Sequence, residues 1–277
     1  MEKKFAFIGA GNMGSAMAEA VCRSIGGAGV MAFDPCGEKA TELSGKTGCL
    51  VAASAEDAVR HCGFVVLCVK PYLIAKVIEQ LCPLLSELEA KGERRVILSI
   101  AAGVSVADIK AAMKSAGGPE LPVIRLLPNT PVTVGKGVIA MCCSETVTEK
   151  EKLFVTEVLS GGGSVMTVEV GLFDRATPVF SCSPAYVYMF IEALADGGVM
   201  CGVPRDMAQE LAARAVMGSA AMVLESGKHP GRLKDDVCSP GGSTIVGVGE
   251  LEKGGMRAAV ISAVEQAYKK TSALGKK

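Results

Sequence analysis

The 277-residue sequence is poor in the side chains that most often carry catalysis. It has no tryptophan, four tyrosines and only two histidines, His61 and His229. Its eleven cysteines include no pair with Cys-x-x-Cys spacing, so zinc catalysis and histidine-based triads are both disfavoured. We expect no metal site. We also expect reduced cysteines that act as small apolar core residues, which is typical of a cytoplasmic protein.

A surplus of one charge and a long apolar run are missing as well. The 29 Lys and Arg residues balance 29 Asp and Glu residues, which argues against a nucleic-acid partner. The mean hydropathy is high, at +0.37, yet the longest uncharged stretch spans only 16 residues, 176–191, and contains two prolines. A membrane-spanning helix needs about 20 apolar residues. We therefore expect no membrane span, and no signal peptide because glycines interrupt the first apolar run.

Apolar runs of strand length alternate with amphipathic segments of helix length over the first 170 residues. The predicted strands are rich in Val, Ile and Phe, and several are continuously apolar, as strands buried on both faces are. They are 4–8, 29–33, 49–52, 64–69, 95–100, 123–126 and 137–141. Helices are predicted at 13–25, 71–86, 106–115 and 149–159. The β-α-β-α order predicts an α/β fold with a mostly parallel, doubly wound sheet of Rossmann type.

The strand pattern ends near residue 170, and an alanine-rich helical pattern follows. Helices are predicted at 184–198 and 204–226, and a final helical stretch from about residue 243 to 274. We therefore expect a dinucleotide-binding domain over residues 1–168 and an all-helical domain over residues 169–277. A lone helical domain of this composition would expose a large apolar surface, so we expect it to form a homodimer.

A glycine-rich turn follows the first predicted strand. The run Gly9-Ala10-Gly11-Asn12-Met13-Gly14 matches G-x-G-x-x-G and opens a predicted helix. In that setting Gly9 permits the tight turn, Gly11 lets a diphosphate approach the backbone, and Gly14 lets the helix pack closely on the strand. The context predicts dinucleotide binding by these six residues.

Asp34 closes the second predicted strand, 20 residues after Gly14. A carboxylate there can accept hydrogen bonds from the adenosine ribose and would repel a 2′-phosphate, which favours NADH over NADPH. Alternatively, Asp34-Pro35 simply starts a turn or caps the next helix. Both interpretations stay open.

Three later segments carry a resemblance to a known family. They are Val69-Lys70-Pro71, Arg125-Leu126-Leu127-Pro128-Asn129-Thr130-Pro131 and Leu233-Lys234-Asp235-Asp236-Val237-Cys238-Ser239-Pro240-Gly241-Gly242-Ser243-Thr244-Ile245. Together with the glycine loop, they resemble the pyrroline-5-carboxylate reductase family. The likeness runs from Phe7 to about Leu274 and includes Ser183-Pro184-Ala185-Tyr186.

The resemblance implies an oxidoreductase acting on a CH–NH bond, which reduces the ring C=N of 1-pyrroline-5-carboxylate with NADH or NADPH in the last step of L-proline synthesis. It implies that the glycine loop holds the diphosphate. It also implies that six further residues line the cofactor cleft: Val69, Lys70, Pro71, Ala101, Ala102 and Asn129. The substrate carboxylate would bind Ser239, Gly241, Gly242, Ser243 and Thr244, with Thr244 donating to the imine nitrogen. In that family the helical domains of two subunits intertwine, and dimers can assemble further into rings.

The residues support this chemistry on their own terms. The segment 239–244 offers small side chains, exposed amides and hydroxyls just ahead of an apolar helical stretch, which suits a carboxylate. Hydride transfer to an iminium needs positioning more than a nucleophile, so the shortage of histidine is expected. Without the resemblance, an ordinary helix-capping loop would be the favoured interpretation of this segment.

Some positions depart from the family pattern. Ala55 stands where many members have an Asn at the adenosine end, which with Asp34 weakens a preference for NADPH. Asp236 stands where some members have an amide, so the site is slightly more acidic. The segment 180–183 differs from the usual Ser-Gly-Ser-Gly or Ser-Gly-Ser-Ser and leaves the local geometry open. Arg125 is predicted to be an ion-pair or sheet-end residue.

Two other functions fit the sequence less well. A β-hydroxyacid dehydrogenase of similar layout needs a lysine after the domain boundary to move the alcohol proton, and residues 171–202 contain none. A cofactor-binding sensor that has lost the chemistry would not need the intact segment 239–244. The sequence leaves open the choice between NADH and NADPH, the assembly beyond a dimer, feedback by proline, and activity on related cyclic imines.

Overall fold

The computed structural model describes residues 4–274, which fall into two compact units. Residues 4–181 together with 268–274 form one unit, here called the sheet unit, and residues 182–267 form the helical unit. The boundary expected between residues 168 and 169 stays a prediction. Residues 1–3 and 275–277, at the ends of the two expected domains, lie outside the described residues.

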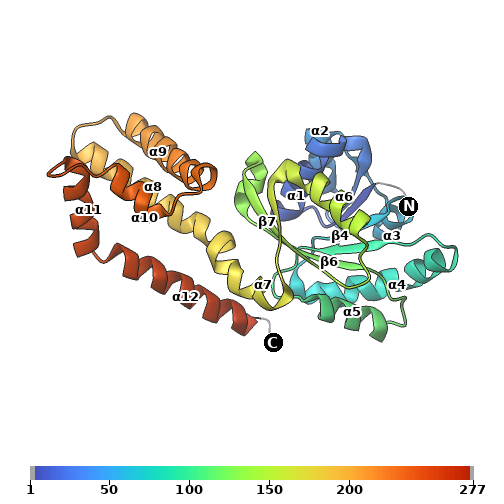
Figure 1. The fold of residues 1–277 in the computed structure, drawn as a ribbon. Coiled ribbons are helices and arrows are strands. Elements are labelled where there is room, and N and C mark those ends of the chain that lie inside the picture. The colour runs from blue at the N-terminus through green and yellow to red at the C-terminus, as the bar shows by residue number, and fades with distance from the viewer. Residues whose placement is uncertain (1–3, 275–277) are drawn as a thin grey trace. The chain divides into compact units, whose positions relative to one another are not determined.

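One eight-stranded sheet, in the order β3-β2-β1-β4-β5-β6-β7-β8, forms the centre of the sheet unit (Figure 1). All neighbouring pairs are parallel except the antiparallel β6–β7 pair, so the expected α/β fold is confirmed. The strands are β1 (Phe5–Ile8), β2 (Val30–Phe33), β3 (Leu50–Val51), β4 (Phe64–Leu67), β5 (Val96–Ser99), β6 (Val123–Pro128), β7 (Gly137–Cys143) and β8 (Gly163–Thr167). The last strand, β8, was not expected from the sequence.

Helices cover both faces of this sheet, which is why its strands are continuously apolar. One face carries α1 (Asn12–Ile25), α2 (Gly37–Thr47) and α6 (Glu149–Leu159), and the other carries α3 (Ala55–His61), α4 (Ile74–Ala90) and α5 (Val106–Ser115) (Figure 1). Alternate residues of β1 serve the two faces: Phe5 packs in the cluster with α1, whereas Ala6 packs in the cluster with α4. The rings of Phe5 and Phe64 stack at 4.9 Å.

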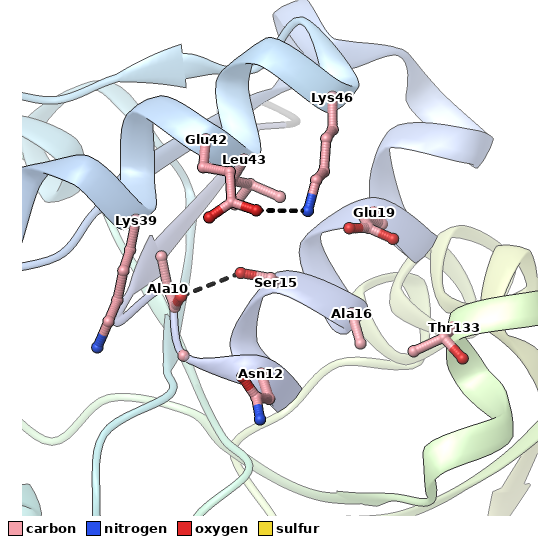
Figure 2. A pocket seen from close by; sticks show the side chains of 11 residues that line it. Ala10, Asn12, Ser15, Ala16, Glu19, Lys39, Glu42, Leu43, Lys46 and Thr133 are labelled. Carbon is pink, nitrogen blue, oxygen red and sulfur yellow. Dashed lines mark hydrogen bonds and ion pairs between the residues drawn. The ribbon is translucent and has the colours of Figure 1, made fainter.

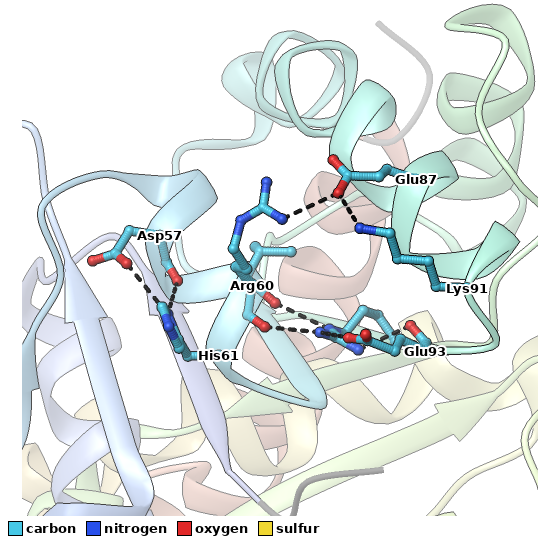
Figure 3. A network of polar contacts seen from close by, with 8 residues as sticks. Asp57, Arg60, His61, Glu87, Lys91 and Glu93 are labelled. Carbon is cyan, nitrogen blue, oxygen red and sulfur yellow. Dashed lines mark hydrogen bonds and ion pairs between the residues drawn. The ribbon is translucent and has the colours of Figure 1, made fainter.

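A polar network ties α3, α4 and the start of β5 together at the amino edge of the strands (Figure 3). The buried guanidinium of Arg95 donates to the carbonyls of Val59 and Arg60 at the end of α3, at 3.0 and 2.9 Å. A cation there satisfies the last carbonyls of the helix and complements its dipole. Glu87 pairs with Arg60 and Lys91 at the surface. The network therefore stabilises the fold at the edge opposite to the glycine loop.

After β8 the chain forms α7 (Val170–Thr177) and a single π-helical turn, Pro178–Cys182, here called the π-turn. Short 3-10 turns lie at Gly27–Gly29, Pro71–Leu73, Thr130–Val134 and Ser160–Gly162. Within residues 4–274, no helix is long and apolar enough to cross a membrane.

The helical unit contains α8 (Ser183–Met200), α9 (Arg205–Ser226), α10 (Pro230–Asp236), α11 (Ser243–Lys253) and α12 (Met256–Leu274), the last of which extends into the sheet unit. Helices α8 and α9 pack through the small buried residues Ala195, Ala208 and Ala212. The helical stretch expected over about 243–274 consists of two helices, because the chain turns at Gly254-Gly255, where Gly255 has φ +71°. That conformation is costly for any other residue.

Candidate active site

Five loops meet at one edge of the sheet because they follow the carboxyl ends of parallel strands. The order β3-β2-β1-β4-β5-β6 reverses direction between β1 and β4, and dinucleotides bind outside this switch point in such folds. The predicted cofactor-binding residues all follow these strands. The glycine loop follows β1, Asp34 follows β2, Val69-Lys70-Pro71 follow β4, Ala101-Ala102 follow β5, and Asn129 follows β6.

The glycine loop has little room for side chains on its inner side. Gly9 has φ +108°, and a Cβ there would lie 2.7 Å from the Cys68 carbonyl oxygen. A Cβ on Gly14 would lie 2.5 Å from the Gly9 carbonyl oxygen. Both contacts are far below normal van der Waals distances and involve backbone atoms. Glycine is therefore required at both positions for β1, β4 and α1 to pack this closely.

The outer side of the loop is open. A Cβ on Gly11 would meet no atom within 4 Å, so the backbone there can be approached closely. Gly11 is also the N-cap of α1, where no side chain caps the helix. The first amides of α1 and the helix dipole thus present a positive end to an anion. The loop fits the diphosphate of a dinucleotide by this geometry.

Asp34 is tied to the glycine loop. Its Oδ2 accepts from the Ala10 amide at 2.8 Å, and its Oδ1 accepts from the Cys36 amide at 2.9 Å. The second bond is the turn expected of Asp34-Pro35. The first bond places a carboxylate beside the glycine loop, where a ribose hydroxyl would donate. Each oxygen has a lone pair left for such a donor.

A cavity of about 420 Å³ begins at the glycine loop and continues between α1 and α2 (Figure 2). It was not expected from the sequence. Lys39 extends along the Ala10 side of this cavity, and the described part of the chain holds no ion-pair partner for it. Lys46 instead pairs with Glu42 at 2.7 Å. Lys39 thus brings a positive charge to the cavity beside the glycine loop.

The loops after β4 and β5 supply mostly backbone and apolar surface. Val69 is half-buried, while Lys70 and Pro71 are exposed ahead of a 3-10 turn. Ala101 is buried and donates its amide to Ser99 Oγ at 3.2 Å, and Ala102 is exposed. Burial raises the pKa of the Cys68 thiol just after β4, so that it stays protonated.

The loop after β6 is held by the side chain of Asn129. Asn129 is buried, and its side-chain amide accepts from the Val138 amide and donates to the Phe180 carbonyl, both at 2.8 Å. Arg125, within β6, forms an ion pair with Asp174 at 2.9 Å, as expected for this residue, and lies 4.3 Å from the ring centre of Phe173.

The predicted substrate segment lies in the helical unit. Gly241 has φ +67°, and the Gly242 amide donates to the Ser239 carbonyl at 3.1 Å, which makes a tight turn. Gly242 is the N-cap of α11, with no side chain capping it, and Ser243 and Thr244 begin the helix with exposed side chains. Free helix amides and two hydroxyls are therefore available to a carboxylate.

The acidic residues before this segment are neutralised locally. Asp236 accepts from Lys228 Nζ at 3.1 Å and from Arg232 Nε at 2.8 Å. The hydrogen bond from Lys228 holds the pKa of Asp236 below its usual range. His229 caps α10 by accepting from the Gly231 amide at 3.1 Å. Hence the extra acid at position 236 adds little net charge to the substrate segment.

No group of three or more His, Cys, Asp or Glu residues able to hold a metal ion occurs within residues 4–274. Cys49, Cys82 and Cys142 are buried thiols, and Cys36 and Cys201 are exposed ones. Burial raises the pKa of Cys142, near the end of β7, to about 11. The structure therefore gathers the predicted cofactor residues at one edge of the sheet unit and places the predicted substrate residues together on one turn of the helical unit. Their assignment to ligands stays a prediction.

Comparison with known proteins agrees with this layout. Residues 171–274 match the family described as pyrroline-5-carboxylate reductase dimerisation, and residues 4–103 match the family described as NADP oxidoreductase, coenzyme F420-dependent. Pyrroline-5-carboxylate reductase of Glycine max is 39% identical over 97% of this chain and 94% of the relative. The protein of that name from Escherichia coli K12 is 37% identical over all of both chains.

Solved structures show the same likeness. The crystal structure of Plasmodium falciparum pyrroline carboxylate reductase, which has NADP bound, covers all of both chains at 32% identity with a TM-score of 0.85. The structure of a pyrroline-5-carboxylate reductase from Coxiella burnetii also covers all of both chains, at 26% identity and a TM-score of 0.88. From the length and identity of these matches, this chain belongs to the pyrroline-5-carboxylate reductase family.

Proposed function

We propose that the protein reduces the ring C=N of 1-pyrroline-5-carboxylate to L-proline with a reduced nicotinamide cofactor. The observation that carries this proposal is the turn 239–244, which offers free helix amides and two hydroxyls at the start of α11. The chain belongs to the pyrroline-5-carboxylate reductase family, and its glycine loop fits a dinucleotide. A nicotinamide bound at the sheet edge supplies the hydride.

The residues of this chain then have separable tasks. The amides of Ser243 and Thr244 hold the substrate carboxylate, and the Thr244 hydroxyl donates to the ring nitrogen. When the imine arrives protonated, hydride addition to the ring carbon leaves a lone pair on the nitrogen, and the Thr244 hydroxyl donates to that lone pair as it forms. No further acid is needed, so orientation and exclusion of water account for most of the catalysis. The glycine loop and the loops after β4 and β5 fix the cofactor. This chemistry needs no catalytic histidine.

The test is oxidation of the reduced cofactor with 1-pyrroline-5-carboxylate, comparing the native protein with Thr244→Ala. Loss of a hydrogen-bond donor to developing charge costs on the order of 100-fold in kcat. Thr244→Ser keeps the hydroxyl and serves as the matched control, with activity close to that of the native protein. If the native protein binds cofactor but oxidises none of it, a cofactor-binding sensor replaces the reductase as the best interpretation.

For the cofactor we propose a preference for NADH. Asp34 is fixed by two backbone amides beside the glycine loop, so it cannot easily turn away from a 2′-phosphate. Lys39 lines the cavity beside the glycine loop, and its positive charge would attract a 2′-phosphate. This side chain is exposed, however, so solvent screens its charge. Asp34→Ser removes the charge and should raise kcat/KM for NADPH relative to NADH by tenfold or more. An unchanged ratio would contradict the role given to Asp34.

We also propose that the protein is a homodimer through its helical unit. Only three small alanines are buried in the core of that unit. Its large apolar residues are instead exposed, among them Met189, Leu211, Leu224, Val246 and Ile261. An exposed apolar surface of this kind is covered in a stable protein. A second copy of the helical unit presents the same apolar surface and can cover it. Light scattering of the full chain should give a dimer or a multiple of it, and a monodisperse monomer would refute the proposal.

A further inference from the structure

The π-turn contains a carbonyl that a regular helix could not satisfy. In an α-helix the Phe180 carbonyl would accept from the amide four residues later, but that residue is Pro184, which has no N–H. Phe180 is half-buried, and without an amide at position 184 its carbonyl is open to a donor from elsewhere in the chain. Single π-helical turns of this kind occur frequently at functional sites.

Asn129 supplies that donor from a position 51 residues earlier in the chain. Its Nδ2 donates to the Phe180 carbonyl at 2.8 Å while its Oδ1 accepts from the Val138 amide at 2.8 Å. Its own backbone amide donates to the Val138 carbonyl at 3.2 Å. The side chain is only 7% exposed. The amide group is therefore fixed at both ends and ties the π-turn to the β6–β7 pair.

A second set of contacts seats the preceding helix on the same strands. Arg125 of β6 pairs with Asp174 of α7. Phe173 is fully buried beside Leu127, and Phe180 packs against this cluster. The π-turn thus continues a segment that is already anchored, and the hydrogen bond from Asn129 fixes its last part.

The hydrogen bond from Asn129 to the Phe180 carbonyl lies at the carboxyl edge of the sheet. Asn129 follows the carboxyl end of β6, whereas Asp34, on the adenosine side, follows β2 on the other side of the switch point. A dinucleotide laid across the switch point puts its nicotinamide half toward β4, β5 and β6. The π-turn is therefore held on the nicotinamide side of the carboxyl edge.

We propose that Asn129 is a positioning residue, which holds the π-turn in place as a wall of the nicotinamide end of the cofactor cleft. The inference rests on the proposed function for the identity of the cofactor. It assigns Asn129 a task through the Phe180 carbonyl, separate from any contact of its own with the cofactor.

Asn129→Asp in the full-length protein is the test. The variant keeps an oxygen to accept from the Val138 amide and replaces the NH2 group with an oxygen that repels the Phe180 carbonyl. The readout is the affinity for NADH divided by the affinity for ADP-ribose, a fragment that lacks the nicotinamide. We expect this ratio to fall about tenfold, with unchanged affinity for ADP-ribose, and kcat with 1-pyrroline-5-carboxylate to fall at least tenfold.

Ser144→Ala is the matched control, because Ser144 is buried and its Oγ accepts from the Val123 amide at the other end of the β6–β7 pair. It should lower Tm by a few degrees and leave the affinity ratio and kcat unchanged. A merely structural role for Asn129 would give the same pattern as this control, and that result would overturn the inference.

Two further arms keep the test decisive. If Asn129→Asp does not fold, Pro184→Ala replaces it. The new amide at position 184 can bond the Phe180 carbonyl as in a regular α-helix, which removes the cause of the π-turn and moves that carbonyl from its place beside Asn129. The affinity ratio should again fall, and an unchanged ratio would refute the inference. If the native protein shows no turnover of the imine, the proposed function fails. The affinity ratio still decides the role of Asn129 in that case, because it is measured without turnover.

Discussion

Alanine substitutions at Gly9 and Gly11 should separate the two tasks of the glycine loop, its packing and its binding of a diphosphate. In Gly9→Ala the new methyl would lie 2.7 Å from the Cys68 carbonyl oxygen, at φ +108°. Neither group can easily move, because the Gly9 amide donates to the Phe33 carbonyl and the Cys68 amide donates to the Ile8 carbonyl, at 2.7 and 2.8 Å. In Gly11→Ala the methyl meets nothing within 4 Å.

The magnitudes follow from these geometries. An L-residue in a sparsely populated backbone region costs about 1–3 kcal/mol, and overpacking costs about as much again. Gly9→Ala should therefore lose about 2–6 kcal/mol of a total stability of roughly 5–15 kcal/mol. At about 2–4 °C per kcal/mol, Tm should fall by roughly 5–20 °C. In Gly11→Ala the poorer N-cap and the stiffer unfolded chain offset each other within about 1 kcal/mol.

The assay pairs thermal unfolding without cofactor with titration of NADH. Gly9→Ala should melt early. Gly11→Ala should melt like the native protein but bind NADH at least tenfold more weakly, because its methyl occupies the open face of the loop. Native affinity in Gly11→Ala would refute the assignment of this loop to the diphosphate. A native Tm in Gly9→Ala would refute the packing argument.

Three smaller predictions concern residues away from the cofactor. The ion pair with Lys228 lowers the pKa of Asp236, so this pair stabilises the folded protein at pH values above the unfolded pKa, and the stabilisation is lost as the pH falls. Asp236→Asn should therefore have a lower Tm than the native protein at neutral pH and an equal Tm in acid. Iodoacetamide should label the exposed Cys36 well before Cys142, whose pKa burial raises to about 11, and equal rates in peptide mapping would contradict this. Arg95→Met leaves three backbone carbonyls without their donor and should cost about 3 kcal/mol in urea unfolding, whereas a loss below 1 kcal/mol would contradict the role of Arg95.

The parallel strands were predictable because strands buried on both faces are continuously apolar, and the glycine loop was predictable because its spacing reflects local backbone geometry. The unexpected strand β8 has the sequence GSVMT, whose small and polar residues and half-exposed surface give neither a continuous nor a clearly alternating pattern. Likewise, the helical stretch expected over about 243–274 is divided at Gly254-Gly255, a break that the apolar pattern on either side does not indicate.

Side-chain bonds between distant segments were the part that the sequence could not provide. The bond from Asp34 to the Ala10 amide links two loops whose proximity depends on the pairing of β1 with β2. The bond from Asn129 to the Phe180 carbonyl spans 51 residues. The one available signal was Pro184, which predicts an unsatisfied carbonyl at position 180 but not which side chain satisfies it.

The central claim is that hydride passes from a nicotinamide to the ring carbon of 1-pyrroline-5-carboxylate, and isotope transfer tests it most directly. The protein is incubated with the imine and with NADH or NADPH in which both hydrogens at C4 of the nicotinamide are replaced by deuterium, and the product is analysed by mass spectrometry. The account predicts L-proline that carries one deuterium at C5, with far less product in Thr244→Ala. Absence of proline, or proline without the label, would contradict it.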